Sequence, residues 1–329
     1  MPKICYEEKQ FGEVALRVIA LANAILIDYA KQGYDLTLRQ LYYRMVAAKL
    51  FPDDRRWVRM STGRWVRDPS GTMNAQPNYK WLGDIMADAR LAGLVDWDYL
   101  VDRTRNLRTN QHWGHPREVV SAAADAFALD KWESQSTRVE VWVEKDAMSG
   151  IVGKVCTGLD VPWFSCRGYT SLSEMWGASQ RLLGYLAEGK EVVILHLGDH
   201  DPSGLDMSGN IFRRLTQFTG QKIKVRRVAL NRAQIDRYNP PPDPAKTSDS
   251  RYEWYVQEYG TEDSWELDAL DPVVITRIIE QNVAIFRDDE IWEGVVSDES
   301  EAKDQLHLVS EQWDHVVKIL EQRGRDVRN

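Results

Sequence analysis

The first apolar stretch of the chain has the pattern of an amphipathic helix. Apolar residues recur at helical spacing from Val14 to Ala30, and the polar residues Arg17, Asn23 and Asp28 interrupt them. A membrane-spanning helix needs about 20 consecutive apolar residues, and a signal peptide has a different arrangement of charge and cleavage site. We therefore expect a surface helix and no membrane segment.

A capping box predicts the second helix. Thr37 is followed three residues later by Gln40, a spacing at which the two side chains satisfy the exposed backbone N–H groups at a helix start. The helix should run to about Leu50. Tyr42 and Tyr43 then fall in its second turn.

A short duplication after this helix predicts a β-hairpin. The sequence Arg-Trp-Val-Arg occurs at residues 56–59 and again at 64–67, on either side of Ser61-Thr62-Gly63. An apolar stripe then predicts a helix over residues 78–92, and an extended stretch should follow from Leu94 to Arg105. Capped helix, hairpin, helix and extended stretch together resemble a winged-helix unit.

Near Ser136 the pattern changes, and short buried strands begin to alternate with helices. Such alternation predicts a parallel, doubly wound α/β sheet. Before this point we expect an irregular stretch at 106–117 and an Ala-rich helix near 117–129. After it we expect strands at 138–144, 161–166, 191–197 and 222–230, and helices at 145–157, at 171–187 and, after the third strand, to about residue 219.

Beyond residue 232 the chain becomes acidic. The run Asn239-Pro240-Pro241-Pro242 breaks regular structure, and the remainder is expected to be mostly helical, most clearly at 272–286 and 298–323. The chain is therefore expected to have three regions. These are a winged-helix domain over 1–135, an α/β domain over 136–232 and an acidic extension over 233–329 that packs on the α/β domain.

The net charge of −8 conceals an uneven distribution of acids and bases. Residues 233–329 carry −13, whereas residues 39–67 carry +6 and residues 210–232 carry +7. A uniformly basic coat is excluded, but contacts to DNA phosphates need only local clusters of bases. The basic residues of 210–232 could bind the DNA backbone, form a solvated face or contact the acidic extension. We expect the extension to screen a basic surface until DNA displaces it.

The cysteines indicate neither a disulfide framework nor a zinc site. Cys5, Cys156 and Cys166 have no close pairing and no His at metal-ligand spacing. A reducing compartment, the cytoplasm, fits this usage.

Three acids are predicted to meet at one edge of the sheet. Glu144 ends the first strand, and Asp199 and Asp201 follow the third. The carboxyl ends of parallel strands form the functional edge of a doubly wound sheet, and oxygen-only ligands suit Mg²⁺ or Mn²⁺. His200 should point away from the ion. The structural alternative is that Asp199 caps a helix and that Glu144 is a surface residue paired with Lys145.

These residues carry a resemblance to a known family. Val143-Glu144-Lys145, Arg167-Gly168-Tyr169 and the run from Gly198 to Gly204 resemble the Toprim domain, a Rossmann-like parallel sheet, of the topoisomerase VI A subunit and the related meiotic double-strand-break proteins. Residues 38–43 resemble the segment of that family's CAP-like winged helix that carries a nucleophilic tyrosine. The two signals occur in the family's order, and the chain's length is similar to that of the short stand-alone relatives in bacteria, plasmids and phages.

Two positions depart from the family pattern. Gln40 stands where an acid is usual, and Thr170 stands where a Pro often follows Gly-Tyr. Neither departure removes a chemical group that the reaction needs. The Trp/Arg hairpin and the segment 265–272 lie outside the part that matches securely.

The resemblance implies a type IIB topoisomerase-like DNA-cleaving enzyme. Tyr43 would be the nucleophile, Arg39 its helper, and the product a 5′-phosphotyrosyl link on double-stranded DNA. A homodimer would place the tyrosine of one subunit at the Mg²⁺ site of the other. The sequence has no Walker A motif, so ATP-driven strand passage would require a separate ATPase subunit. The structural alternatives are that Tyr43 is a packed aromatic and that Arg39 is an ordinary phosphate contact.

Two other functions fit the same residues. A metal-dependent nuclease would use water as its nucleophile and leave Tyr43 structural. A DNA-binding or partner-recruiting protein would keep the fold with an inactive site. A phosphatase of the Asp-x-Asp type fits less well, because its motif belongs after the first strand of the sheet.

Overall fold

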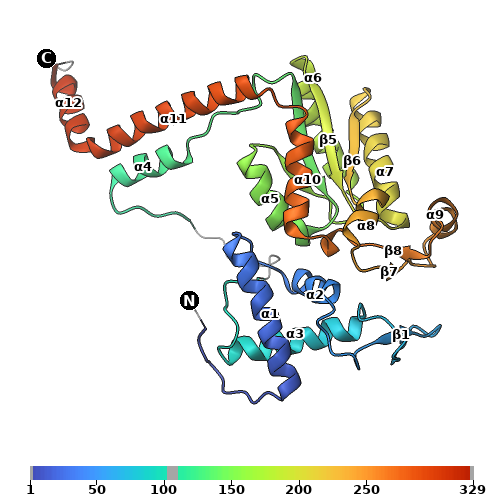
Figure 1. Ribbon diagram of the computed structural model, residues 1–329. Helices are drawn as coiled ribbons and strands as arrows, with labels where there is room; N and C mark the ends of the chain where they lie inside the picture. The colour runs from blue at the N-terminus through green and yellow to red at the C-terminus, as the bar shows by residue number, and fades with distance from the viewer. Residues whose placement is uncertain (1–2, 102–109, 327–329) are drawn as a thin grey trace.

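Four parallel strands form the central sheet of the computed structural model, which describes residues 3–101 and 110–326 (Figure 1). Their order across the sheet is β4-β3-β5-β6. The α/β fold with a parallel sheet is therefore confirmed. The strands are β3 (Thr137–Val143), β4 (Trp163–Ser165), β5 (Glu191–Leu197) and β6 (Lys224–Ala229).

Helices cover both faces of this sheet, because its strands are apolar on both sides. On β5, Val193, Leu195 and Leu197 belong to one hydrophobic core, and Val192 and Ile194 belong to the other. Parallel strands that are buried on both faces have nearly continuous apolar sequences for this reason. The first core includes residues of α5 (Ser149–Gly158) and α10 (Pro272–Ala284), and the second includes residues of α6 (Leu172–Ala187) and α7 (Pro202–Thr219).

The register of β3 and β5 brings the ends of the two strands to the same level. Thr137 pairs with Glu191 at one end and Val143 pairs with Leu197 at the other. The N–H of Glu144 then donates to the carbonyl of Leu197 at 2.9 Å. The chain leaves both strands side by side, and β3 continues through Glu144 into a short 3-10 helix, η1 (Asp146–Met148).

The N-terminal region has a separate hydrophobic core built from three helices. Buried residues such as Leu26, Leu41 and Leu82 bring the helices together. The Thr37 capping box is present with both of its hydrogen bonds, and the capped helix ends at Ala47 rather than near Leu50. The elements are α1 (Glu13–Lys31), α2 (Leu38–Ala47), α3 (Gln76–Leu91) and the antiparallel hairpin of β1 (Trp57–Arg59) and β2 (Trp65–Arg67).

The expected extended stretch after α3 is wrong over the part that the structure describes. Residues 94–101 form turns, with one isolated bridge between Leu36 and Leu100. The reason is that α3 ends in a left-handed turn at Gly93, after which Leu94 folds back to donate to the carbonyl of Ala89. Residues 102–105 of this expected stretch lie outside the described residues, as does part of the irregular stretch 106–117.

The acidic extension divides into two parts with different surroundings. Its first part contributes α10 to the core of the sheet, together with the buried residues Trp265 and Leu267. Its second part leaves the sheet as a long helix that lies along α4 (Pro116–Ala126) (Figure 1). The elements are α8 (Arg232–Tyr238), β7 (Asp243–Pro244), α9 (Tyr252–Tyr259), β8 (Asp263–Ser264), the 3-10 helix η2 (Leu267–Ala269), α10, α11 (Asp289–Glu311) and α12 (Trp313–Asp326).

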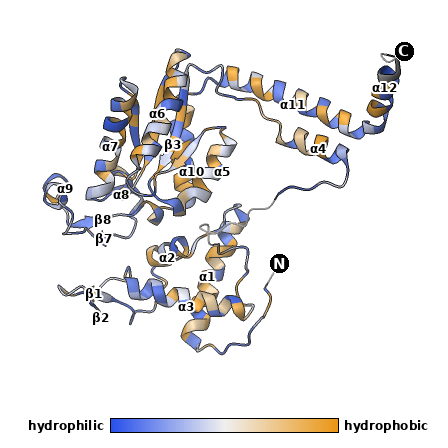
Figure 2. Ribbon diagram, turned by 180° about the vertical axis from the view of Figure 1, so that it is seen from behind, coloured by the Kyte–Doolittle hydropathy of each residue, from blue (hydrophilic) through white to orange (hydrophobic). Residues whose placement is uncertain are grey.

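The helix expected over 298–323 is corrected to two helices. The first begins earlier, at Asp289, where Asp288 caps it, and it ends at Gln312, before the second begins at Trp313. Figure 2 shows hydrophobic and hydrophilic residues alternating along α11, which matches its contact with α4 on one side only. The expected packing of the extension on the α/β region therefore holds for α10 and for the start of α11, where Trp292 belongs to the core of the sheet, and α11 also packs on α4.

No helix in the described ranges combines the length and the apolar character needed to cross a bilayer.

All three cysteines are free thiols; Cys156 and Cys166 are buried, and Cys5 is exposed.

Candidate functional site

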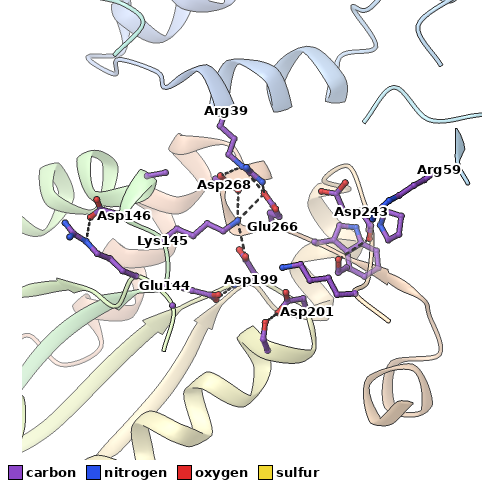
Figure 3. A pocket seen from close by; sticks show the side chains of 18 of the residues that line it. Arg39, Arg59, Glu144, Lys145, Asp146, Asp199, Asp201, Asp243, Glu266 and Asp268 are labelled. Carbon is purple, nitrogen blue, oxygen red and sulfur yellow. Dashed lines mark hydrogen bonds and ion pairs between the residues drawn. The ribbon is translucent and has the colours of Figure 1, made fainter. Parts of the chain in front are cut away.

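The three acids predicted from the sequence line one pocket at the carboxyl edge of the sheet. Glu144 follows β3, and Asp199 and Asp201 follow β5. The pocket has a volume of about 670 Å³ (Figure 3). We call it the carboxylate pocket; its charged lining residues are Arg39, Arg59, Glu144, Lys145, Asp146, Arg167, Asp199, Asp201, Asp243, Lys246, Glu266 and Asp268.

The loop after β5 bends tightly around Glu144. The Oε2 atom of Glu144 accepts a hydrogen bond from the N–H of Asp199 at 2.9 Å. Two glycines make this approach possible. A Cβ atom on Gly198 would lie 2.8 Å from that Oε2, and one on Gly204 would lie 2.4 Å from the carbonyl oxygen of Asp199. The Gly residues at both ends of the motif are thus required by the close contact of loop and carboxylate.

Asp201, rather than Asp199, caps the helix that follows. Asp201 Oδ1 accepts from the N–H of Gly204 at 2.6 Å and from the hydroxyl of Ser203 at 2.9 Å. Asp199 Oδ1 instead accepts from the N–H of Leu267 at 2.8 Å. The structural alternative for Asp199 is therefore wrong. His200 points away as predicted, and its Nδ1 lies 3.0 Å from the hydroxyl of Tyr255.

The structural alternative for Glu144 is also wrong, because Lys145 pairs with other acids. Its ammonium lies 3.0 Å from Asp199, 3.1 Å from Glu266 and 3.2 Å from Asp268. Figure 3 shows Lys145 between Asp199 on one side and the two extension acids on the other. Asp268 is completely desolvated at 1% exposure, so its charge depends on this lysine and on Arg39.

Sequence reasoning missed Glu266 and Asp268 as residues of the site. They lie more than 60 positions after the Asp-x-Asp motif, and no spacing rule connects the two segments. A backbone bridge makes the connection: the N–H of His200 donates to the carbonyl of Trp265 at 2.8 Å, and the N–H of Trp265 donates back at 3.0 Å. The available signal was the dense run of acids in 262–271 beside an aromatic residue.

Helix α2 brings Arg39 and Tyr43 to the same acids. The Tyr43 hydroxyl donates to Glu266 Oε2 at 2.6 Å, and an Arg39 N–H donates to the Tyr43 oxygen at 3.3 Å. Arg39 also pairs with Glu266 and lies 3.0 Å from Asp268. The predicted helper Arg39 therefore lines the carboxylate pocket together with the predicted metal ligands, although they come from opposite halves of the sequence. The predicted nucleophile Tyr43 lines an adjoining pocket and contacts the carboxylate pocket through its hydrogen bond to Glu266.

The neighbouring Tyr42 has a different environment. Its hydroxyl accepts from the N–H of Ala75 at 2.7 Å and donates toward Asn74 Oδ1 at 3.0 Å, so it is a hydrogen-bonded part of the N-terminal core. Both tyrosines are buried, but only Tyr43 presents its hydroxyl to the site acids. The preference for Tyr43 over Tyr42 agrees with this geometry.

The electrostatics keep Tyr43 in its phenol form. Burial raises the pKa of Tyr43, the charges of Asp268 and Glu266 raise it further, and Arg39 opposes them. Glu266 is ionised, since Lys145 and Arg39 lower its pKa to about 2 against the effect of burial. The Tyr43–Glu266 contact is therefore a hydrogen bond from a neutral phenol to a carboxylate.

Burial and crowding disfavour the ionised forms of the acids on the strand ends. Burial raises the pKa of Glu144, and the charge of Asp201 adds to this effect. Burial also raises the pKa of Asp199 to about 7, with Glu144 and Asp268 adding to it and Lys145 opposing. Crowded carboxylates of this kind are stabilised by a cation.

The donor set fits the chemistry of a divalent cation. Glu144 and Asp201 each use one oxygen for backbone N–H groups, and hard carboxylate oxygens are what Mg²⁺ and Mn²⁺ prefer. Within residues 3–101 and 110–326, no three His, Cys, Asp or Glu side chains are already gathered around one point as metal ligands. In the described conformation the Lys145 ammonium serves as counterion to Asp199.

The basic stretch 210–232 has several local roles. Arg227 is half-buried and donates to the carbonyls of Gly204 at 2.8 Å and Gly198 at 2.9 Å, so it supports the Asp-x-Asp loop. Arg232 pairs with Asp236 in α8 at 3.1 Å. Asp236 belongs to the acidic extension, and another extension acid, Asp271, lies 3.4 Å from Arg44 in the N-terminal region.

A scan of protein-family models finds no match to this chain, and a search of curated proteins finds no significant match. The geometry of the site is therefore the basis on which a function can be proposed.

Proposed function

We propose that this chain is a divalent-metal-dependent, topoisomerase VI A-like transesterase that cleaves double-stranded DNA with Tyr43. The observation that carries the proposal is that Arg39 lines the carboxylate pocket with Glu144, Asp199 and Asp201 and donates to the Tyr43 oxygen, while the Tyr43 hydroxyl donates to Glu266 of the same pocket.

In the proposed reaction, the phenolic oxygen of Tyr43 forms a bond to phosphorus and the bond from phosphorus to the 3′ oxygen breaks. Tyr43 loses its proton, and the leaving 3′ oxygen gains one. Arg39 favours the phenolate and binds the phosphate oxygens. A divalent cation held by Glu144, Asp199 and Asp201 would supply charge stabilisation for the phosphate and the leaving oxygen.

The described conformation suits a resting state in this scheme. Tyr43 is bound to Glu266 as a phenol, and its pKa is raised rather than lowered. Seven acids line the carboxylate pocket against five bases, so a DNA phosphate would be repelled. For reaction, Tyr43 and Arg39 must leave Glu266. A homodimer in which Tyr43 engages the carboxylates of the partner subunit would satisfy this requirement.

A metal-dependent nuclease is the second candidate, and the Tyr43–Glu266 hydrogen bond favours it. A tyrosine held as a phenol can serve only to join the N-terminal region to the acidic extension, in which case water would attack the phosphate. An inactive DNA-binding protein is the third candidate, because Lys145 already neutralises Asp199.

A plasmid assay separates these candidates. Supercoiled DNA is incubated with Mg²⁺ or Mn²⁺ and with wild-type, Tyr43→Phe or Tyr42→Phe protein, and 5′ covalent adducts are sought after denaturation. The transesterase predicts adducts with wild type and with folded Tyr42→Phe, but none with Tyr43→Phe. Cleavage without adducts by all three proteins identifies the nuclease. DNA binding without any cleavage identifies the inactive protein or one that needs a separate ATPase subunit.

A further inference from the structure

A second pocket lies against Tyr43, on the side of the N-terminal region. It has a volume of about 340 Å³, and its walls include Tyr43, Arg39, Arg59, Trp65, Gln76 and Tyr79. We call it the Tyr43 pocket. Its volume is at the lower end of the range for small-molecule sites, which begins at about 300 Å³.

Beside the carboxyl of Asp243, the walls of the Tyr43 pocket combine three kinds of group. Trp65 and Tyr79 are half-buried aromatic rings. Gln76, the first residue of α3, is exposed and carries an amide that both donates and accepts. Arg39 and Arg59 supply guanidinium groups. Aromatic rings stack on nucleobases, amides bind their edges, and guanidinium groups bind phosphate.

The two pockets share part of their walls. Arg39, Arg59, Trp65 and Asp243 line both of them. Figure 3 shows Arg59 and Asp243 on the same side of the carboxylate pocket, opposite Glu144. The Tyr43 hydroxyl contacts Glu266 on the carboxylate side, while the same residue lines the second pocket. A phosphate attacked by Tyr43 would therefore have its attached nucleoside next to the Tyr43 pocket.

We infer that the Tyr43 pocket receives one unstacked nucleoside of the DNA strand, with Trp65 stacking on its base and Arg59 binding its phosphate. The inference rests on the proposed function, which brings a phosphodiester to Tyr43. It assigns the duplicated hairpin a role in recognition at the cleaved position. Extruding a base is cheapest where the base is already unpaired, so the protein selects DNA with an unpaired or weakly paired nucleotide.

Binding measured in EDTA tests this without any cleavage. The full chain is titrated into a short duplex with one unpaired 2-aminopurine and into the same duplex with an abasic residue at that position. We expect affinity on the order of tenfold higher when the base is present, which is typical of one stacked base. The 2-aminopurine fluorescence should fall on binding. Equal affinity for the two duplexes would overturn the inference.

Two matched pairs of variants locate the interaction. Trp65→Leu should remove the preference for the base, whereas Trp113→Leu, an exposed tryptophan outside both pockets, should keep it. Arg59→Gln should weaken binding several-fold more than Arg64→Gln, although both arginines are exposed on the same hairpin. If Trp65→Leu fails to fold, the comparison of Arg59→Gln with Arg64→Gln tests the assignment. Equal losses of affinity in these two variants would contradict it.

The outcome is separable from that of the plasmid assay. A base preference without covalent adducts supports the Tyr43 pocket while the transesterase fails. Adducts without a base preference support the transesterase while the Tyr43 pocket assignment fails.

Discussion

Tyr43 donates its hydroxyl hydrogen bond to Glu266 at 2.6 Å, across 223 positions of sequence. Helix α2 supplies the phenol and the acidic extension supplies the carboxylate. The sequence predicts that the extension screens basic residues. In the structure, two acids of the extension pair with Arg39 and Arg44 in the N-terminal region, beside the proposed nucleophile.

Glu266→Gln should release Tyr43. The substitution keeps the shape of the side chain but removes the charge that raises the pKa of Tyr43 and pairs with Arg39. We expect adducts with supercoiled DNA to form faster, on the order of tenfold, since hydrogen bonds to charged groups contribute about 1.5–3 kcal/mol. The rate is measured by trapping adducts with detergent at a series of times.

Glu262→Gln is the control for this experiment, because Glu262 is exposed in the same segment and the change in net charge is the same. It should leave the rate unchanged. A slower reaction with Glu266→Gln would contradict a holding role and would identify Glu266 as the group that accepts the proton of Tyr43.

Arg227→Leu should destabilise the fold. The guanidinium donates to the carbonyls of Gly198, Gly204 and Leu230, and the variant would lose all three hydrogen bonds. A hydrogen bond from a charged group contributes about 1.5–3 kcal/mol, so we expect a loss of about 3 kcal/mol or more in the free energy of unfolding. Urea denaturation followed by circular dichroism measures it. Arg226→Leu, on the next exposed position, should change stability by about 0.5 kcal/mol or less.

Asp243→Asn should stabilise the protein at high pH only. Burial and the charge of Glu266 raise the pKa of Asp243 to about 6, while Asn74, Arg39 and Tyr43 oppose them. The folded state therefore holds this proton more tightly than the unfolded state, and the stability contributed by the acid falls as the pH rises through 6.

Urea denaturation at pH 4 and pH 8 checks this difference. Asp243→Asn should gain roughly 2 kcal/mol over wild type at pH 8 and nothing at pH 4. Asp249→Asn is the opposite control, because hydrogen bonds from Arg251 lower the pKa of Asp249, and its loss should reduce stability at pH 8. An equal effect of Asp243→Asn at both pH values would show that ionisation is not the cause.

Thr37→Ala should shorten or fray α2. The Thr37 hydroxyl accepts from the N–H of Gln40, and the Gln40 side chain accepts from the N–H of Thr37 in return. Loss of such a cap costs about 1 kcal/mol. Thermal unfolding should show the lower stability, and Thr62→Ala in the exposed hairpin turn should not. Equal midpoints for the two variants would mean that packing alone holds the start of α2.

Local rules were sufficient for much of the fold and for part of the site. The capping box at Thr37 and the buried run of β5 depend on neighbours in sequence, and both were predicted correctly. Glu144, Asp199 and Asp201 were placed together because parallel strands end at a common edge. The pairing of Lys145 with Glu266 and Asp268 could not be predicted in this way. These two acids are brought to the site by the backbone hydrogen bonds between His200 and Trp265, which no local sequence pattern predicts.

The break in the last helix has a different cause. Residues 298–323 keep an apolar period throughout, so the sequence predicts one helix, whereas the structure divides it at Gln312. Periodicity describes which side of a helix is apolar and not where its axis changes direction. In the structure α4 lies along the first of the two helices.

The backbone bridge between His200 and Trp265 links two events that could otherwise be independent. Asp199 precedes this bridge on one strand, and Glu266 follows it on the other. A cation that repositions Asp199 would therefore shift the carboxylate that binds Tyr43, and by thermodynamic reciprocity the release of Tyr43 would change the affinity for that cation by the same factor. In such a linked pair, the fraction of protein with Tyr43 released from Glu266 would rise or fall together with the fraction that holds the cation.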